Sequence, residues 1–295
     1  MLTLKISDLS TADLQNYLQY AIAPRPICFA STIDKQGNVN LSPFSFFNLF
    51  STNPPVCIFS PARRVRDNTT KHTLQNVLEV PECVINIVNY DMVQQTSLTS
   101  SEYAKGVNEF VKAGFTELKS ECVKPPRVAE APVQLECVIS KVISLGENAG
   151  AGNLILAEIK LIHIQEDILD ENGKIDQQKI DLVARLGGDW YCRVTKENLF
   201  KVAKPLSTLG IGFDALPKSI KQSKILSGNN LGQLANVERL PLPQEVNVFK
   251  SAPEFRDFLE KLPQIDSLRE LKLHTLAKEY LERGDVQTSW KILMS

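Results

Sequence analysis

Residues 27–164 contain the feature that most constrains the fold, a succession of short strands separated by turns. The segments 27–33 and 39–41 predict one hairpin, and the segments 133–144 and 154–164 predict a second, longer one. Their residues are largely β-branched and aromatic, as is typical of strands. Many short strands of this kind favour a barrel or a sandwich over a parallel α/β sheet. We therefore expect a mainly β fold with short helices inserted between strands.

Residues 40–59 interleave phenylalanine with small polar side chains. Ser45, Asn48 and Ser51 recur at three-residue intervals among the phenylalanines. A wall that is apolar on one side and hydrogen-bonding on the other suits a flat ligand, because apolar faces bury a ring while a few polar groups orient it. A buried strand followed by a turn at residues 54–55 explains the same pattern without any ligand.

Residues 60–73 combine a basic loop with the predicted start of a helix at Thr73. Three arginines, one lysine and several hydroxyl groups lie in this segment. A helix N-terminus offers unpaired N–H groups, and Arg or Lys adds charge-assisted hydrogen bonds, so an anion could bind here. A solvated basic loop is the alternative. No GxGxxG or GxxxxGK motif follows a strand, so the sequence supports neither a Rossmann site nor a P-loop.

The charges of the chain are balanced. Its 295 residues include 33 basic and 34 acidic ones, which gives a formal net charge of −1 without any block of one sign. This balance disfavours nucleic acid and anionic membranes as partners. The opening residues lack the pattern of a signal peptide, and no apolar run approaches the roughly 18 residues of a membrane span. We expect a cytoplasmic protein that binds neither nucleic acid nor membrane.

The cysteines and histidines predict neither disulfides nor a metal site. Four of the six cysteines lie in apolar, strand-like segments, where a reduced thiol packs as a small hydrophobic group. These four are Cys28, Cys57, Cys83 and Cys137. The three histidines are far apart in the sequence, which is too poor a supply for structural zinc.

Residues 241–295 predict a small helical extension after a proline-containing linker. Capping boxes that begin at Ser251 and Ser267 predict two helix starts, and Gly284 is expected to end the second helix. Nothing in this extension suggests chemistry, so its apolar stripe is expected to pack against the barrel or a second subunit. At the opposite end of the chain, Ser10 is expected to cap a short helix.

Several short motifs occur in an order and with gaps that resemble those of a known family. They are Pro24-Arg25-Pro26, Ala30-Ser31-Thr32, Ser42-Pro43-Phe44-Ser45-Phe46-Phe47-Asn48, Pro54-Pro55, Lys71-His72-Thr73, Asn86, Ala129-Glu130-Ala131-Pro132 and Leu186-Gly187-Gly188. Each motif is weak alone, whereas the set is specific. Between about residues 18 and 240 the chain is similar to the flavin reductase-like family, which includes flavoredoxin-like proteins.

The resemblance implies a fold and a domain map. The fold would be an FMN-binding split β-barrel of Greek-key type with short inserted helices and a C-terminal helical appendage. Residues 1–240 would form the barrel domain, in which the segment 205–240 is similar to a trailing segment of one branch of the family and would wrap the barrel. Residues 241–295 would form the helical extension.

The resemblance also implies where FMN would bind. The isoalloxazine ring would lie along residues 43–51, and the phosphate would lie at the basic loop, which favours the anion-binding alternative there. The expected cofactor-binding residues are Ser31, Thr32, Ser45, Phe46, Asn48, Ser51, Ser60, Arg63, Arg64, Lys71 and Thr73. The family's usual homodimer, with the cofactor near the subunit interface, is implied as well.

In such proteins the flavin supplies the chemistry, by accepting hydride from NADH or NADPH and passing electrons to an acceptor. No side-chain nucleophile or general base is needed, so the sequence predicts no catalytic residue and no metal. Three functions stay open at this point: an NAD(P)H-dependent flavin reductase, an FMN-binding electron carrier reduced by a partner, and a non-catalytic scaffold. The sequence does not identify the electron acceptor.

Two departures from the family's motifs put the use of NAD(P)H in question. Short flavin reductases carry Gly-Asp-His in a hairpin loop where this chain has Gly150-Ala151-Gly152-Asn153. Lys71-His72-Thr73 also stands where Lys-Asp-Thr is commoner. His163 is a conceivable substitute for the missing histidine, but its place within the strand 154–164 favours a structural role.

Overall fold

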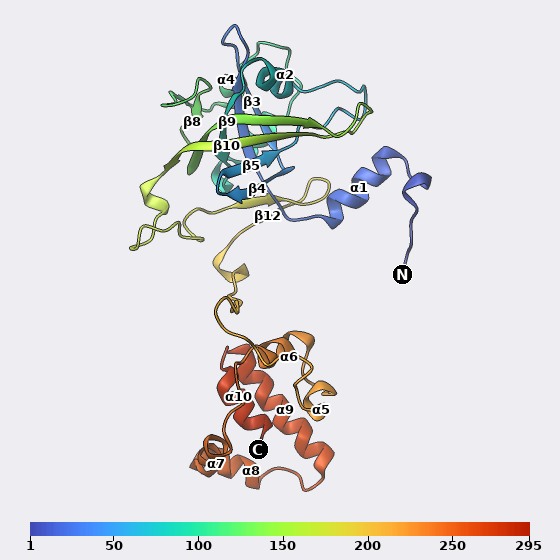
Figure 1. The fold of residues 1–295 in the computed structure, drawn as a ribbon, viewed down its shortest axis with the longest axis vertical. Coiled ribbons are helices and arrows are strands. Elements are labelled where there is room, and N and C mark those ends of the chain that lie inside the picture. Colours follow the sequence, from blue (N-terminus) through green and yellow to red (C-terminus); the bar gives the residue numbers. More distant parts are fainter. The chain divides into compact units, whose positions relative to one another are not determined.

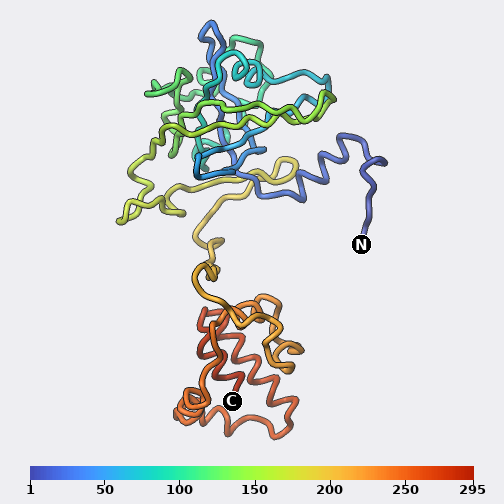
Figure 2. The backbone as a smooth tube through the Cα atoms, viewed as in Figure 1, coloured from blue at the N-terminus to red at the C-terminus, as the bar shows by residue number.

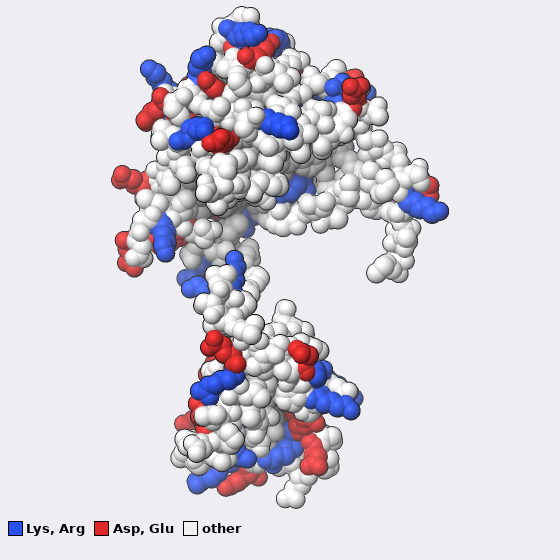
Figure 3. All heavy atoms as spheres, in the orientation of Figure 1, with Lys and Arg blue, Asp and Glu red and all other residues white.

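The computed structural model describes residues 1–295 and divides the chain into two compact units, Met1–Phe200 and Lys201–Ser295. Strands gather in the first unit, whereas the second is made of helices (Figure 1). No helix combines the length and the apolar character that a membrane span requires. On the face visible in Figure 3, acidic and basic side chains are interspersed over both units, in line with the balanced composition.

Seven antiparallel strands form the main sheet of the first unit. In sheet order they are β3 (Val39–Phe44), β2 (Cys28–Ile33), β6 (Glu82–Ile87), β9 (Val133–Ser144), β10 (Asn153–Ile164), β5 (Pro55–Phe59) and β4 (Phe47–Thr52). The edge strands β3 and β4 are separated in the chain only by Ser45 and Phe46. Because so short a connection spans no more than about 11 Å, the sheet curls until its two edges approach each other. The result is the predicted split barrel, which opens at Ser45 and Phe46.

The core of the barrel lies inside this curled sheet. Alternating residues of the strands point inward, such as Cys57 and Phe59 of β5 and Ile155 and Ala157 of β10. The four cysteines predicted to be reduced core residues lie in this cluster as free thiols, which confirms that prediction. A second apolar cluster, which includes Phe29 of β2, covers the other side of the sheet.

Short helices, which appear as coils of the tube in Figure 2, and two small sheets complete the first unit. The helices are α1 (Thr11–Ala21), α2 (His72–Glu79), α3 (Val93–Leu98) and α4 (Glu109–Ala113), with single 3₁₀ turns at Ile6–Asp8, Tyr90–Met92, Glu166–Ile168 and Lys196–Asn198. The small sheets pair β1 (Arg25–Pro26), β11 (Val183–Arg185) and β12 (Tyr191–Arg193), and β7 (Glu117–Leu118) with β8 (Arg127–Val128). As predicted, Ser10 caps α1, since its Oγ accepts a hydrogen bond from the Asp13 N–H.

The second unit contains six helices with their own apolar cores. They are α5 (Lys218–Lys221), α6 (Gly228–Ala235), α7 (Pro243–Ser251), α8 (Pro253–Glu260), α9 (Asp266–Glu282) and α10 (Val286–Leu293). The unit begins at Lys201, whereas the predicted boundary lies at residue 240. The physical reason is that Leu216 and Leu234 pack in one core with Leu281 and Trp290. Burial therefore joins the segment 205–240, which was expected to wrap the barrel, to the helices that follow it.

Both predicted capping boxes are wrong. Ser251 is the last residue of α7, and α8 begins instead at Pro253, which suits a first helical position because proline needs no N–H partner there. Helix α9 begins at Asp266, so Ser267 lies inside it. Gly284 does follow the end of α9, with a positive φ of 82° that suits glycine.

Candidate functional site

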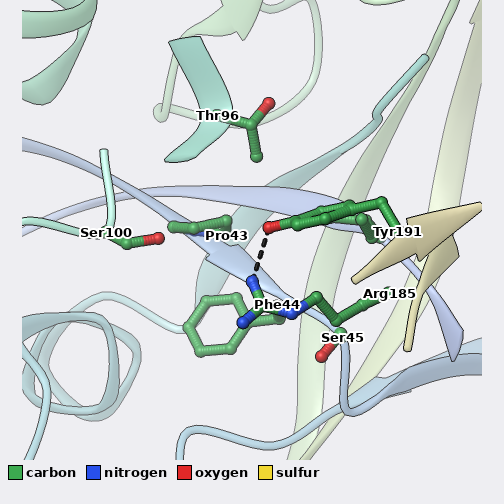
Figure 4. Close-up of a pocket in the computed structure, with 8 residues that line it drawn as sticks. Pro43, Phe44, Ser45, Thr96, Ser100, Arg185 and Tyr191 are labelled. Carbon is green, nitrogen blue, oxygen red and sulfur yellow. Dashed lines mark hydrogen bonds between the residues drawn. The ribbon is translucent and has the colours of Figure 1, made fainter. Parts of the chain in front are cut away.

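Two open pockets meet where β3 ends, at the opening of the barrel. The first, here called the lysine pocket, has about 480 Å³ of free space and is lined by Gln19, Pro43, Phe44, Ser45, Phe46, Ser60, Ala62 and Lys71. The second, the arginine pocket, has about 350 Å³ and is lined by Ile27, Pro43, Phe44, Ser45, Thr96, Ser100, Arg185 and Tyr191 (Figure 4). Because residues 43–45 line both pockets, the two share one wall.

Four of the residues predicted to bind a cofactor line the lysine pocket together. Ser45 and Phe46 come from the bend between β3 and β4, Ser60 follows β5, and Lys71 precedes α2. These segments meet because the curled sheet brings its first and last strands together. With Phe44, which also lines it, the pocket thus offers two hydroxyl groups, two aromatic rings and one ammonium group.

The Lys71 ammonium is the strongest feature of the lysine pocket. It is half-buried and makes no hydrogen bond or ion pair, and its Nζ lies 4.9 Å from the centre of the Phe44 ring. Burial, and after it the charge of Arg64, lowers the pKa of Lys71 below the ordinary value for lysine. A desolvated cation without a carboxylate partner is costly, and an anion bound in the pocket would offset that cost.

Thr32 and Thr73 position this lysine and do not line either pocket. Thr73 Oγ1 accepts a hydrogen bond from Asn40 Nδ2 at 3.1 Å, and Thr32 Oγ1 accepts one from Asn76 Nδ2 at 3.2 Å. All four side chains are buried. The two bonds fasten α2 to β2 and β3, which fixes the start of the helix and therefore Lys71. Ser31 lies fully buried in β2, and its Oγ has no hydrogen-bond partner.

The guanidinium groups of Arg63 and Arg64 are engaged by residues of their own loop and, for Arg64, also by Glu102. Arg63 donates from Nε and Nη2 to Asn68, at 2.6 and 2.7 Å, and Arg64 donates to Thr69 Oγ1 at 2.8 Å and to Glu102 at 3.1 Å. Neither arginine lines the lysine pocket or the arginine pocket. These contacts shape the loop that carries Ser60 and Lys71, so Lys71 is the cation of this segment that remains for a ligand.

The segment 43–51 is not the single flavin-facing strand that the sequence suggested. It bends at Ser45 and Phe46, and β3 and β4 on either side of the bend are opposite edges of the sheet. Asn48 is exposed on β4, where its Oδ1 accepts a hydrogen bond from the Leu49 N–H. Ser51 is half-buried further along the strand. Neither of these two predicted residues lines the lysine pocket or the arginine pocket.

The hairpin loop between β9 and β10 supports the floor of the lysine pocket. Ser60 Oγ accepts a hydrogen bond from the Asn153 N–H at 3.1 Å, and the backbone of Arg63 pairs with Ala151 and Gly150 at 2.8 and 3.1 Å. These hydrogen bonds hold the hairpin loop against the basic loop, so it acts as a brace.

Arg25, Arg185 and Tyr191 were missed as site residues, although Arg25 itself and the residues that follow Arg185 belong to the family motifs. Arg25 donates to the carbonyls of Gln19, Ile22 and Leu186 and, at 3.4 Å, to Ser45 Oγ. It therefore ties α1 and the β11–β12 turn to the wall that both pockets share. The available signal was the pair of motifs Pro24-Arg25-Pro26 and Leu186-Gly187-Gly188.

The glycines of that turn are required by a close contact with α1. A Cβ added at Gly187 would lie 2.2 Å from Tyr20 Cγ, and one added at Gly188 would lie 2.5 Å from the Tyr20 hydroxyl. The ring of Tyr20 thus contacts the turn directly. Tyr20 follows Gln19, which lines the lysine pocket. No larger residue fits at Gly187 unless the ring of Tyr20 moves.

We expect Gly187→Ala to lower the free energy of unfolding by about 1–3 kcal/mol, because the added methyl group overpacks the turn. Urea denaturation would measure the change. Gly146→Ala is the matched control, since a Cβ there meets only ordinary contact at 3.5 Å. A second substitution, Tyr20→Ala, should relieve most of the cost. An unchanged stability, or a double variant no more stable than Gly187→Ala, would refute the contact.

His163 has the structural role that the sequence favoured. Its Nε2 lies 2.8 Å from a carboxylate oxygen of Glu136, whose side chain is fully buried. The same carboxylate accepts hydrogen bonds from the backbone N–H groups of Glu121, Cys122 and Val123. His163 and Glu136 line neither pocket, so this cluster anchors a loop and is separate from the candidate site.

Comparisons with known proteins agree on one family. Residues 20–179 match the model described as the flavin reductase like domain. A protein of Aquifex aeolicus (strain VF5) is 40% identical over 181 residues, which are 61% of this chain and 90% of that protein. The structure of nitrilotriacetate monooxygenase component B from Bacillus cereus is 28% identical, with a TM-score of 0.64, and the match covers 68% of this chain and 98% of that one.

Flavoredoxin of Desulfovibrio vulgaris (Miyazaki F) shares the fold at 19% identity, with a TM-score of 0.52 over 62% of this chain and 92% of that one. The family match ends at residue 179 and therefore lies within the first unit. Both pockets lie in this unit as well, and the arginine pocket draws two of its residues, Arg185 and Tyr191, from beyond the match.

Proposed function

The chain belongs to the flavin reductase-like domain family, and we propose that it is a flavoprotein that binds FMN in the lysine pocket and acts as an NAD(P)H-dependent flavin reductase. One observation carries the proposal: Lys71 holds a half-buried ammonium group without a partner in a pocket that otherwise offers hydroxyl groups and aromatic rings. A phosphate ester attached to a flat heteroaromatic ring has the matching chemistry.

The residues of the lysine pocket suit the two ends of such a ligand. Lys71 would neutralise the phosphate, and Phe44 and Phe46 would cover apolar surface. Ser45 and Ser60 each already accept a hydrogen bond from the protein, from Arg25 Nε and from the Asn153 N–H. A hydroxyl group whose oxygen accepts in this way keeps its proton to donate, so both serines would donate to acceptor atoms of the ligand. Bound FMN would supply the hydride and electron transfer chemistry.

An electron carrier that a partner protein reduces is the second candidate. It is favoured by the hairpin loop at residues 150–153, which has no histidine and whose backbone is engaged in bracing the basic loop. The two functions differ in whether NADH or NADPH reduces the bound flavin directly.

Anaerobic mixing of the FMN-loaded protein with NADH or NADPH separates the candidates. A reductase bleaches the flavin absorption near 450 nm, on the order of once per second or faster. Flavin that stays oxidised with both nucleotides, but is reduced by dithionite, would support the electron carrier. A protein that retains no FMN once the free cofactor has been removed would support a non-catalytic scaffold.

We further propose a homodimer with the cofactor near the subunit interface. Helix α1 projects from the edge of the barrel (Figure 1) and contains no buried residue, although it carries exposed Tyr17 and Leu18. The edge strand β4 exposes Leu49 and Phe50 by 53% and 65%. Such apolar surface is typical of an interface.

We expect static light scattering at micromolar concentration to give twice the chain mass of 32.9 kDa. Phe50→Glu should shift the protein towards the monomer, because it places a charge on the exposed apolar edge. Phe50→Tyr is the conservative control and should stay dimeric. A monomer mass for the unaltered protein would count against the dimer.

A further inference from the structure

The arginine pocket contains a second cation that FMN in the lysine pocket would not neutralise. We propose that this pocket binds a small planar carboxylate, held by Arg185, beside the flavin. The inference rests on the proposed function in one respect, namely that the ligand would be a second substrate of the flavin site. Binding itself can be measured with or without FMN.

The charge of Arg185 is uncompensated. Its guanidinium group donates hydrogen bonds to the Tyr191 hydroxyl and to the Gly188 carbonyl, both of which are neutral, and it makes no salt bridge. None of the eight residues that line the pocket is acidic. Arg25 adds to the positive potential, because its own hydrogen-bond partners are carbonyls and Ser45 Oγ, none of which is charged. Burial lowers the pKa of Arg25, and the charge of Arg185 lowers it further.

Arg25 and Arg185 differ in how many of their N–H groups remain free to bind a ligand. Arg25 uses Nε, Nη1 and Nη2 for the protein, with Nη1 serving two carbonyls. Arg185 uses one bond from each of its two terminal nitrogens, so three of its five N–H groups stay available. A planar fork with free N–H groups can bind the two oxygens of a carboxylate at once.

The walls of the arginine pocket favour a flat organic acid over a simple ion. In Figure 4, the Arg185 guanidinium group points to the Tyr191 hydroxyl, and Pro43, Phe44 and Ser45 lie near this pair. The Arg185 guanidinium lies 4.8 Å from the centre of the Tyr191 ring. Ile27 adds a further apolar side chain. A ring could thus pack on apolar surface while its carboxylate meets the guanidinium.

The hairpin that carries both residues is held in place by a separate cluster. Arg193 of β12 donates from Nε and Nη2 to the Asp181 carboxylate, at 2.7 Å in each case, and its guanidinium lies 3.7 Å from the centre of the Tyr90 ring. These contacts lie outside the pocket. They hold β11 and β12 and so keep Arg185 oriented before any ligand arrives, which lowers the entropic cost of binding.

Benzoate and benzamide form a matched pair of probes, because they share shape and differ in charge. We expect benzoate to raise the melting temperature of the protein and to perturb the spectrum of bound FMN. Benzamide and inorganic phosphate should do so about tenfold more weakly or not at all. Equal effects of benzamide and benzoate would overturn the inference, as would phosphate competing as strongly as benzoate.

Arg185→Gln should weaken benzoate binding by about tenfold or more while the affinity for FMN stays within about twofold. Arg66→Gln, in the exposed basic loop, is the charge-matched control and should change neither. Arg185→Lys keeps the charge but loses the fork, so it should give an intermediate loss. Unchanged benzoate binding in Arg185→Gln, with a native melting temperature, would refute the inference.

The remaining outcomes separate this inference from the proposed function. If Arg185→Gln loses FMN to the same extent as benzoate, the arginine pocket is part of the flavin site and no carboxylate site exists. A protein that binds FMN but shows no response to benzoate would overturn the inference alone. A protein that responds to benzoate but binds no FMN would overturn the proposed function and leave the carboxylate site standing.

Discussion

We expect the replacement of Lys71 by methionine to weaken FMN binding by about 10- to 150-fold, which corresponds to a charge-assisted hydrogen bond of about 1.5–3 kcal/mol. Methionine keeps the length and the apolar stem of lysine, so the half-buried position stays filled. The loss should concern the phosphate end of the ligand, because Lys71 is the basic residue that lines the lysine pocket. Quenching of flavin fluorescence would measure the FMN affinity of the unaltered protein and of the variant.

Riboflavin provides the control for this prediction, since it shares the ring system and lacks the phosphate. Its affinity should change little in Lys71→Met. Lys141→Met, at an exposed position of β9, should leave both ligands unaffected. If FMN and riboflavin lose affinity equally, Lys71 acts on the ring or on the fold and the assignment of the phosphate end is wrong.

We expect Glu136→Ala to lower the free energy of unfolding by about 3–5 kcal/mol, the range typical when one partner is removed from a buried ionic cluster. The carboxylate accepts hydrogen bonds from three backbone N–H groups and contacts His163, and the substitution removes the acceptor of all these donors. Urea denaturation would measure the change. Glu121→Ala is the control, because that carboxylate is exposed and lies 3.9 Å from His163. A loss below about 1 kcal/mol would contradict the anchoring role.

The same cluster predicts how stability depends on pH. Burial alone would raise the pKa of Glu136, but hydrogen bonds from Cys122, the backbone and His163 outweigh it and lower the pKa to about 2. Because the folded state binds this proton more weakly than the unfolded state, the stabilisation is complete above the ordinary pKa of glutamate, about 4.5. It is lost as the pH falls from about 4.5 towards 2. Glu136→Gln should lack this part of the pH dependence, and a parallel pH profile would contradict the prediction.

Local signals predicted most of the fold. The strand periodicity placed β9 with its bounds at Val133 and Ser144, and Ser10 marked the start of α1. The apolar surroundings of the cysteines predicted four buried thiols. These successes share a cause, since alternation and caps are properties of neighbouring residues. The boundary of the second unit was missed, because it depends on Leu216 and Leu234 packing with Trp290, far along the chain.

The candidate site was predicted only in part, because some of its residues lie in segments with a local pattern and others are brought in by contacts between distant segments. Ser45, Ser60 and Lys71 lie in segments whose composition already suggested a polar wall and an anion loop. The free role expected of Arg63 was not found, because Asn68, in a left-handed conformation with φ of 56°, turns back and accepts its hydrogen bonds. Arg185 joins the site only through a hairpin that contacts Arg25 at Leu186, and no local pattern reports such a distant pairing.

Titration of the purified protein with FMN, followed by flavin fluorescence, tests the central claim most directly. The account predicts saturable quenching with one FMN bound per chain and a Kd in the micromolar range or below, on the order expected for a specific pocket with one ionic anchor. Riboflavin should bind more weakly by about tenfold or more. No quenching at FMN concentrations up to about 1 mM, a limit of about −4 kcal/mol in binding free energy, would contradict the claim that this barrel is a flavin site.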